Sequence, residues 1–374
     1  MYGSDRCLYE LLRGADKNQI WPEVVLPFEG ELSEKLRALG IPVYITDPWV
    51  LRKGVFHSMQ FLRYVLKLPV SVFRLARIIR NRHISVVYSN TSVIPGAALA
   101  AFVTRRPHIV HLREFYDNYP GLSPFYRSFL CLFSRRIVAI STAVAAFVKK
   151  SCPEKVIRVY DGIDLGRFTG TDSTVPDMLS SWKHENRIIV ADIGRISPIK
   201  GQELFIDAAR LCFEQHPDLR FLVVGGVFRG NESYLERLQA RVRALGLQNA
   251  VLFTGFRRDA DDFIRNSDII VLSTLISEGL GQVVMEGMAA GKAVVAPDKG
   301  GPVELIEHET DGILYEAGSI DALARSVLRL ADDSVFRKSL GKNARDKAHR
   351  QFGIQNNIQA IERIIRKTAP VNPA

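Results

Sequence analysis

The feature that most constrains the fold is a regular alternation between short apolar runs and longer helical patterns. The runs are rich in Val and Ile, and amphipathic segments such as 202–215, 234–245 and 323–330 separate them. Such alternation predicts parallel sheets covered by helices, with ligands near the carboxyl ends of the strands. Because the pattern runs through both halves, we expect an α/β fold with two doubly wound, Rossmann-like domains. The expected strands span 24–27, 42–46, 84–89, 108–112, 136–140, 156–160, 188–193, 220–225, 251–254, 269–273, 293–297 and 312–315.

Size and charge narrow the class of protein further. The chain has 374 residues, of which 47% are hydrophobic and 24% charged, as expected for a globular protein of two domains. The net charge of +10 is unevenly spread: residues 1–160 carry 23 Lys/Arg and 11 Asp/Glu, whereas residues 161–374 carry 27 and 29. An anionic membrane surface, an acidic acceptor or a nucleic acid would each match the basic first half.

Cysteine usage and hydropathy indicate the compartment. The four cysteines are scattered without CxxC spacing, so we expect buried thiols in a reducing compartment and neither disulfides nor a zinc site. No signal peptide is visible, and the longest uncharged apolar run, 93–103, is shorter than the roughly 20 residues of a membrane-spanning helix. We therefore expect a cytoplasmic protein that can lie peripherally on the inner face of the membrane. The cysteines are Cys7, Cys131, Cys152 and Cys212.

Two glutamates eight residues apart lie in and after a glycine-rich turn. Glu278 belongs to the turn, where Gly279 and Gly281 let a ligand approach the backbone, and Glu286 falls within a helix expected from about 280 to 290. The first amides of that helix lack helical partners and carry partial positive charge, which suits a diphosphate. A carboxylate within the helix can accept hydrogen bonds from a ribose. The alternative is that both are solvated surface acids; the glycines favour a nucleotide site.

A second candidate anion site follows the expected strand 188–193. Gly194 permits a tight turn, Arg195 offers a planar fork for phosphate oxygens, and Lys200 offers a mobile point charge. Positive groups of this kind stabilise the negative charge that develops on a departing nucleoside diphosphate. The alternative is that both side chains are merely solvated in a loop. A helix start disfavours cations, however, so their presence there favours an anionic ligand.

In order and spacing, these segments resemble the retaining glycosyltransferases of family 4, the glycogen-synthase-like group 1 enzymes, which have the GT-B fold. The resemblance extends over nearly the whole chain and is strongest from 188 to 316. It implies two Rossmann-like domains that face a central cleft. Retention of anomeric configuration is likewise implied by the family and not by the spacing of residues.

The resemblance also implies roles for residues of the second half. Arg195 and Lys200 match the positions that bind the donor diphosphate, and Glu286 matches the position that binds the ribose. Glu278 matches a catalytic position near the transferred sugar and the phosphates. The adjoining Gly279, Leu280 and Gly281 would line the donor site.

The first half offers weaker candidates. His111 lies near the end of the expected strand 108–112, and a lone histidine is more often a packing or surface residue. Family members often carry a histidine after this strand that touches the donor sugar, which implies a catalytic role for His111, with Arg113 and Glu114 as secondary candidates. Residues 2–12 resemble the glycine loop and first helix of the family, which implies that Gly3 contacts the donor.

The domain boundary is expected near 161–187, where a turn signal precedes a linker-like stretch rich in Thr, Ser, Asp and Pro. Residues 159–168 resemble the family's crossover segment, with Asp161 in place of the usual asparagine. We expect an acceptor-side domain over 1–165, a donor-binding domain over 166–352, and a C-terminal helix with a tail over 353–374 that packs back on the first domain.

The beginning of the chain differs from the family pattern. Family members carry an apolar strand before the glycine loop, usually central in the sheet, and residues before Gly3 contain no such strand. We therefore expect the chain as written to be poorly stable unless another segment fills that position.

Two further segments have alternative interpretations. Asp259 and Asp261 form a DxD sequence that binds metal in other glycosyltransferases, but acids are also favoured in the first turn of a helix. We expect helix capping and no metal, because Arg195 and Lys200 supply the positive charge. The basic, apolar segment 61–83 is expected as two helices broken at Pro69; they either lie on an anionic bilayer or simply face the core.

We expect a glycosyltransferase that moves a sugar from a UDP-, GDP- or ADP-sugar to a hydroxyl group. The acceptor would be a glycan or lipid-linked saccharide in cell-envelope polysaccharide biosynthesis. One alternative keeps the fold and makes the protein a sugar-nucleotide epimerase or a phosphorylase. Another is a basic nucleic-acid-binding protein, but the chain carries no RNP or zinc motif, so we expect no nucleic-acid partner.

Overall fold

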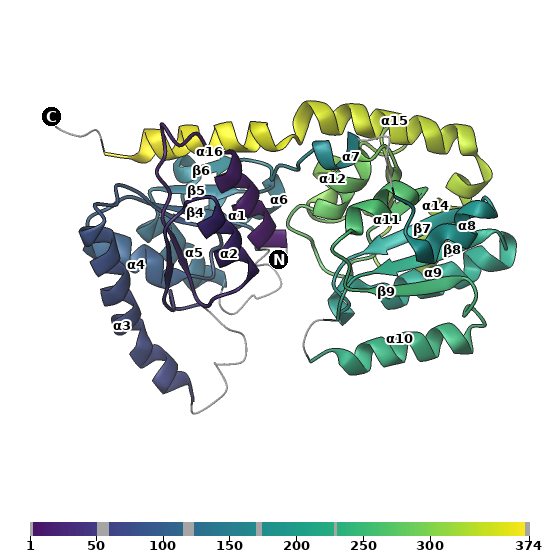
Figure 1. The fold of residues 1–374 in the computed structure, drawn as a ribbon, viewed down its shortest axis with the longest axis horizontal. Helices are drawn as coiled ribbons and strands as arrows, with labels where there is room; N and C mark the ends of the chain where they lie inside the picture. The colour runs from purple at the N-terminus through teal and green to yellow at the C-terminus, as the bar shows by residue number, and fades with distance from the viewer. Residues whose placement is uncertain (1–2, 51–59, 115–122, 170–173, 228–229, 371–374) are drawn as a thin grey trace. The chain divides into compact units, whose positions relative to one another are not determined.

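The computed structural model describes residues 3–50, 60–114, 123–169, 174–227 and 230–370 (Figure 1). It divides the chain into two compact units. The first comprises Met1–Gly162 together with Ile354–Ala374, and the second comprises Ile163–Gly353. The described part contains no helix that is long and apolar enough to cross a membrane.

The first unit is built on parallel strands in two sheets. Within the described residues, the shorter sheet pairs only β1 with β2 and is not hydrogen-bonded to the longer one, whose order is β3-β4-β5-β6. The shorter sheet packs its apolar side chains with α1 and α2, around Val24, Leu36 and Ile41. The strands are β1 (Val24–Leu26), β2 (Val43–Ile45), β3 (Val87–Ser89), β4 (His108–Leu112), β5 (Arg136–Ala139) and β6 (Val156–Arg158).

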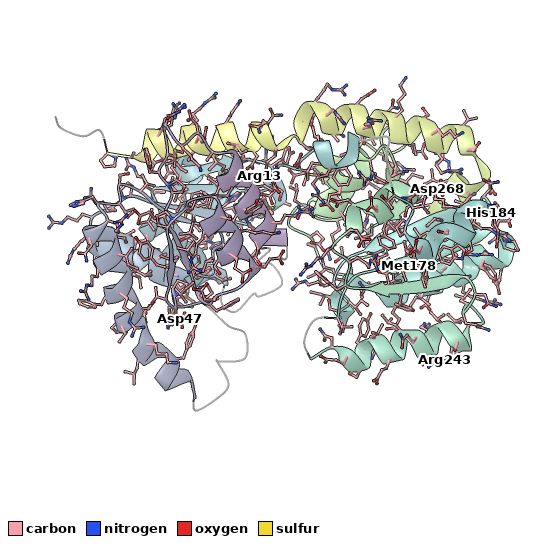
Figure 2. All side chains as sticks on the ribbon, in the orientation of Figure 1. Arg13, Asp47, Met178, His184, Arg243 and Asp268 are labelled. Atoms are coloured by element: carbon pink, nitrogen blue, oxygen red, sulfur yellow. A yellow bond between two sulfur atoms is a disulfide. The ribbon has the colours of Figure 1, made fainter. Side chains whose placement is uncertain are left out.

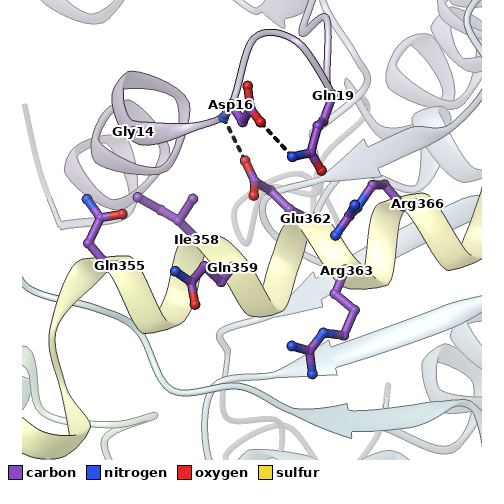
Figure 3. A pocket seen from close by; sticks show the side chains of 9 residues that line it. All are labelled: Gly14, Asp16, Gln19, Gln355, Ile358, Gln359, Glu362, Arg363 and Arg366. Atoms are coloured by element: carbon purple, nitrogen blue, oxygen red, sulfur yellow. Dashed lines mark hydrogen bonds between the residues drawn. The ribbon is translucent and has the colours of Figure 1, made fainter.

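Helices of the first unit flank these sheets. The last helix of the chain lies beside the first one, and its buried isoleucines pack with Ile109 and Val138 of the longer sheet (Figure 1). The Asp16 amide also donates to Glu362 Oε1 at 2.7 Å, in a groove between that helix and the loop after α1 (Figure 3). The helices are α1 (Gly3–Gly14), α2 (Glu31–Ala38), α3 (Gln60–Asn81), α4 (Pro95–Val103), α5 (Ser123–Phe133), α6 (Thr142–Lys149) and α16 (Ile354–Thr368).

The expectation that Pro69 breaks the segment 61–83 is wrong. Residues Gln60–Asn81 form one continuous helix, α3, with Pro69 inside it. Proline removes one amide donor and leaves the carbonyl of the residue four positions earlier without its helical partner. That residue is Val65, which is exposed, as is Pro69, so water can hydrate the carbonyl.

The expectation of four buried thiols is also wrong for two of the cysteines. Cys131 on α5 and Cys152 after α6 form a disulfide, with their Cα atoms 5.9 Å apart. The two cysteines are 21 positions apart in the sequence. They meet because α5 and α6 pack against each other, and the spacing of cysteines in the sequence does not reveal such packing. Cys7 and Cys212 are buried thiols, as expected.

The second unit contains a six-stranded parallel sheet in the order β12-β11-β10-β7-β8-β9. Helices α9, α10 and α14 bury Leu204, Leu238 and Val327 against strand residues such as Phe221. The α/β class with parallel sheets is therefore confirmed. The strands are β7 (Ile188–Ile193), β8 (Leu219–Val224), β9 (Val251–Gly255), β10 (Ile269–Val271), β11 (Ala293–Pro297) and β12 (Ile313–Tyr315).

Helices connect these strands and continue to the end of the unit. They are α7 (Gly166–Thr169), α8 (Ser180–His184), α9 (Gln202–Gln215), α10 (Glu232–Ala244), α11 (Ala260–Asn266), α12 (Gln282–Ala289), α13 (Pro302–Leu305), α14 (Ile320–Asp332) and α15 (Ser334–Gln351). Short 3-10 turns occur at η2 (Pro153–Lys155), η3 (Asp177–Leu179) and η4 (Pro198–Lys200), of which η2 belongs to the first unit.

Strand order changes direction at β7. The chain runs from β7 to β8 and β9 on one side and then returns to place β10 against the other side of β7. At such a reversal the connections from two neighbouring strands continue to opposite sides of the sheet, and open α/β sheets bind ligands at the carboxyl ends of those strands.

Packing of α16 on the first unit generates a stability prediction. Ile361 is 1% exposed, and its truncation to alanine leaves a cavity, so Ile361→Ala should lower the free energy of unfolding by about 2–5 kcal/mol. Ile45, which is 39% exposed on β2, provides the matched control, and Ile45→Ala should cost much less. Urea unfolding of both variants measures the difference; equal losses would contradict this packing.

Candidate functional site

The loops that follow β7 and β10 are in direct contact. Gly201, at the end of η4, has φ of 73°, and a Cβ atom there would lie 1.9 Å from the carbonyl oxygen of Ser273. The Leu275 amide donates to the Ile199 carbonyl at 3.1 Å, and the Ser273 hydroxyl lies 2.9 Å from the Lys200 carbonyl. The two loops therefore form one structural element at the strand-order reversal.

This contact brings together two residues predicted from the sequence. Lys200 Nζ forms an ion pair with Glu278 Oε1, and the two side chains are 25% and 20% exposed. A cation and a carboxylate thus share one partly solvated position.

Glu286 lies on α12, which spans Gln282–Ala289 and begins two residues later than expected. It is 8% exposed, and its Oε1 lies 3.7 Å from Nη1 of Arg167. Arg167 also donates from Nε to Asp261 Oδ2 at 2.6 Å and forms a second bond to the same carboxylate. Sequence reasoning placed Arg167 in the crossover segment but missed its contact with Glu286, because 119 positions separate the two residues.

The glycine-rich turn at 278–281 packs against a second pair of glycines, Gly300 and Gly301. Gly281 has φ of 92° and is the residue before α12, whereas Leu280 is 4% exposed and packs into the core. A Cβ atom on Gly301 would lie 2.3 Å from the Leu280 Cα atom, and the Gly301 amide donates to the Glu278 carbonyl at 3.0 Å. Residues 300–301 therefore hold the Glu278–Gly281 backbone in place.

Arg195 is exposed in the loop after β7. The Gln202 side chain positions this loop, because its amide nitrogen donates to the Arg195 carbonyl at 3.2 Å and its oxygen accepts from the Ser197 amide at 3.4 Å. Arg195, Lys200, Glu278 and Glu286 all belong to the second unit and follow β7 or β10.

Asp192 is a site residue that sequence reasoning missed. It is 3% exposed near the end of β7 and accepts a hydrogen bond from the Ser273 hydroxyl at 2.9 Å. Burial raises the pKa of Asp192 to about 7, against the lowering effects of Ser273 and Lys200. A carboxyl group below the Lys200 loop therefore changes charge near neutral pH. Its position inside an apolar strand carried no sequence signal.

His111 lies in the first unit on β4 and is 1% exposed. Its Nδ1 atom is 2.5 Å from the Tyr88 hydroxyl and 3.3 Å from Arg113 Nη2. Burial, followed by the charge of Arg113, lowers the pKa of His111 well below its ordinary value, so the ring is neutral. Its Nε2 atom is buried without a hydrogen-bond partner among the described residues.

The secondary candidates next to His111 organise the surrounding loops. Arg113 forms an ion pair with Asp161 and donates from Nε to the Asn90 carbonyl at 3.0 Å. Burial alone lowers the pKa of Arg113, but Asp161 and other neighbours raise it above its ordinary value. Glu114 accepts from the Ser92 amide at 3.2 Å and from nearby hydroxyl groups. Gly3 is the first residue of α1, also in the first unit.

The DxD acids are engaged in ion pairs. Asp259 precedes α11 but makes no side-chain capping bond, because its carboxylate binds Arg257 at 2.6 Å. Both acids lie at the start of α11 as expected, with Asp261 in its first turn, but the side-chain capping bond is absent and Asp261 binds Arg167. Within the described ranges, no three His, Cys, Asp or Glu side chains are grouped as metal ligands.

Asp192 makes stability depend on pH. Its pKa rises from an ordinary value of 3.8 to about 7 on folding, so the unfolded chain releases this proton first. The free energy of unfolding should therefore fall between about pH 4 and pH 7, and the loss is complete above the folded pKa. The asparagine of Asp192→Asn cannot ionise. The melting temperature of this variant minus that of the wild type should therefore be larger at about pH 8 than at about pH 5.

Thermal melts of both proteins at the two pH values measure this difference. Asp346→Asn, at an exposed aspartate on α15, is the control and should follow the wild type at each pH. Parallel pH profiles for Asp192→Asn and the wild type would contradict the assignment.

Sequence profiles of two glycosyltransferase families match most of the chain. The profile described as Glycosyltransferase Family 4 matches residues 1–167, and the profile described as Glycosyl transferases group 1 matches residues 178–347. The second match contains Arg195, Lys200, Glu278 and Glu286.

Curated relatives and solved structures extend the comparison. The lipopolysaccharide core biosynthesis mannosyltransferase LpcC of Rhizobium leguminosarum is 28% identical over 225 residues, which are 60% of this chain and 62% of that protein. A second relative is the UDP-Gal:alpha-D-GlcNAc-diphosphoundecaprenol alpha-1,3-galactosyltransferase of Escherichia coli. It is 26% identical over 215 residues, which are 56% of this chain and 54% of that protein. The chain thus spans between about half and two thirds of the length of these relatives.

The crystal structure of Anabaena HepE in complex with UDP and glucose matches with a TM-score of 0.82 and 25% identity, over 98% of this chain and 96% of that chain. Further structural neighbours are glycosyltransferases and a sucrose-phosphate synthase from Thermosynechococcus elongatus, the latter with a TM-score of 0.68 and 17% identity. With both sequence profiles and the parallel α/β units in agreement, the chain belongs to the group 1, family 4-type glycosyltransferases with the GT-B fold.

Proposed function

We propose that this protein transfers a sugar from a nucleoside-diphosphate sugar to a hydroxyl group, with retention of configuration. The observation that carries the proposal is the joining of the loops after β7 and β10, which pairs Lys200 with Glu278 at the strand-order reversal. An anion-binding cation and a helix with an internal carboxylate thus lie in one unit, as a nucleoside diphosphate requires.

The diphosphate is the group that Arg195 and Lys200 bind. As the glycosidic bond breaks, negative charge grows on the leaving diphosphate, and cations already positioned there stabilise it without reorganisation. Binding of the diphosphate frees Lys200 from Glu278, and Glu278 then faces the transferred sugar. The proposal needs no metal, since Arg195, Lys200 and the first amides of α12 provide the positive potential.

The nucleoside contacts the second carboxylate. Glu286 accepts hydrogen bonds from the ribose hydroxyls, and Arg167 fixes its orientation from 3.7 Å away. The turn at Gly279, Leu280 and Gly281 contributes backbone amides, because the Leu280 side chain is turned into the core.

Within the first unit, the residues that we propose to bind sugar are His111 and the backbone of Gly3. The neutral ring has a buried Nε2 atom without a partner among the described residues, and a sugar hydroxyl would reach it once the side chains that cover it move. Tyr88 and Arg113 hold the ring through Nδ1, so its orientation is set before the donor arrives.

The donor and acceptor classes are inferred from relatives. Anabaena HepE binds UDP and glucose, which favours a UDP-sugar as the donor of this protein. GDP- and ADP-sugars are the alternative donors. The lipopolysaccharide core mannosyltransferase and the diphosphoundecaprenol galactosyltransferase support a glycan or lipid-linked saccharide acceptor in cell-envelope biosynthesis. Such an acceptor would be met in the cytoplasm at the inner face of the membrane.

Donor binding tests the site. Lys200→Ala and Glu286→Ala should each weaken the binding of a UDP-sugar at least about tenfold, because each removes a hydrogen bond in which one group is charged. Calorimetric titrations with UDP-, GDP- and ADP-sugars measure the dissociation constants. Exposed residues of the same type give the controls Lys342→Ala and Glu236→Ala, which should bind as the wild type does. Unchanged affinity in both site variants would overturn the assignment.

Product release tests the reaction. A transferase releases nucleoside diphosphate in step with glycosylation of an added acceptor, whereas an epimerase converts the donor without releasing it. Lys200→Ala should lower this release by about 10²–10³-fold, as removal of a charge-stabilising donor does at other sites. Donor conversion without any nucleoside diphosphate would favour the epimerase.

A further inference from the structure

The first unit has long stretches of sequence without any acidic residue. Residues 48–113 contain 11 Lys/Arg and no Asp/Glu, and residues 118–153 contain 5 Lys/Arg and again no Asp/Glu. These stretches include α3, α4 and α5, which pack in a row: α3 against α4, and α4 against α5. The positive charge is therefore concentrated on one set of neighbouring helices.

The exposed face of α3 combines apolar and basic side chains. Its inner face buries Leu75 and Ile79 against α4. The outer face carries Leu66, Val70 and Phe73, which are 64%, 51% and 69% exposed and repeat at helical spacing. The same stripe continues with exposed Arg77 and Arg80 toward the end of the helix.

The neighbouring helices expose a similar face. Phe125 and Leu132 on α5 are 81% and 72% exposed and lie seven positions apart, on one side of the helix. Phe102 at the end of α4 is 64% exposed. Its ring packs edge-to-face on that of Phe133 of α5, with the ring centroids 5.2 Å apart. The exposed pair Arg105 and Arg135 follows these two helices.

We propose that the outer faces of α3, α4 and α5, defined by Leu66, Val70, Phe73, Phe102, Phe125 and Leu132, dock on an anionic lipid bilayer. Apolar and aromatic side chains enter the boundary between headgroups and acyl chains, while the arginines bind lipid phosphates. The inference rests on the proposed function to the extent that a lipid-linked acceptor would be met at this surface. It also assigns the membrane contact to three helices, whereas the sequence suggested only the segment 61–83.

The combination of side chains favours lipid over other partners. A second copy of the chain would have to bring two strongly basic faces together, which like charges oppose. A nucleic acid would be bound by the arginines but gains little from exposed leucine and valine, since its backbone is charged and its bases stack on aromatic rings. A bilayer surface satisfies both kinds of side chain.

Vesicle sedimentation tests the proposal with the full chain. The protein should co-sediment with vesicles in which phosphatidylglycerol replaces about one third of the phosphatidylcholine, and much less with phosphatidylcholine alone. The double variant Leu66→Ser/Phe73→Ser should lower the partition coefficient about tenfold or more, and Phe125→Ser/Leu132→Ser should do the same. Arg77→Glu/Arg80→Glu should lower it by at least about fivefold per residue.

Matched controls come from the second unit. Val335→Ser changes a valine that is 78% exposed on α15, and Arg243→Glu changes an exposed arginine on α10 (Figure 2); both should leave vesicle binding unchanged. All altered side chains are exposed, so melting temperatures should match that of the wild type. Equal binding to both vesicle types, or binding that none of the three double variants weakens, would overturn the proposal.

The same experiment separates this inference from the proposed function. Donor affinity measured without vesicles should be unaffected by the α3 and α5 variants, whereas Lys200→Ala should keep full vesicle binding. Concentration-dependent self-association that these variants abolish, in place of lipid binding, would assign the face to a second copy. A salt-sensitive shift of duplex DNA with no vesicle binding would assign it to nucleic acid.

Discussion

The candidate site depends on the close approach of the loops after β7 and β10. The positive φ of Gly201 and its missing Cβ atom allow the backbone of the first loop to lie against the Ser273 carbonyl. This approach, and not side-chain length alone, places Lys200 beside Glu278. The parallel sheet provides the geometry, because β7 and β10 are neighbours whose connections leave in different directions.

At this point Lys200 and Glu278 balance each other's charge. Lys200 and Glu278 are 25% and 20% exposed, so water screens part of their attraction and the pair can exchange for a stronger partner. Below them, Asp192 can bind a proton near neutral pH, and its carboxyl group reaches Ser273, whose hydroxyl also contacts the Lys200 carbonyl. The position of the Lys200 loop therefore depends on a buried carboxyl group.

Sequence patterns predicted the sheets well because strands buried on both faces read as apolar runs. The second-unit strands Ile188–Ile193 and Ala293–Pro297, for example, have the predicted bounds. Glu278 and Lys200 were predicted from glycine-rich turns, whose backbone requirements are local. The same reasoning missed Arg167 and Asp192, whose contacts join distant parts of the chain. It failed at Pro69, where exposure relieves the missing hydrogen bond, and at Cys131 and Cys152, where only tertiary packing brings the sulfur atoms together.

The central claim is that a nucleoside diphosphate binds where the loops after β7 and β10 meet. Hydrogen–deuterium exchange of the full chain, with and without saturating UDP, tests it most directly. Slower exchange is predicted for the amides of residues 194–201 and 278–286, with smaller changes across the rest of the second unit. Unchanged exchange in both segments at saturating UDP, GDP and ADP would contradict the claim.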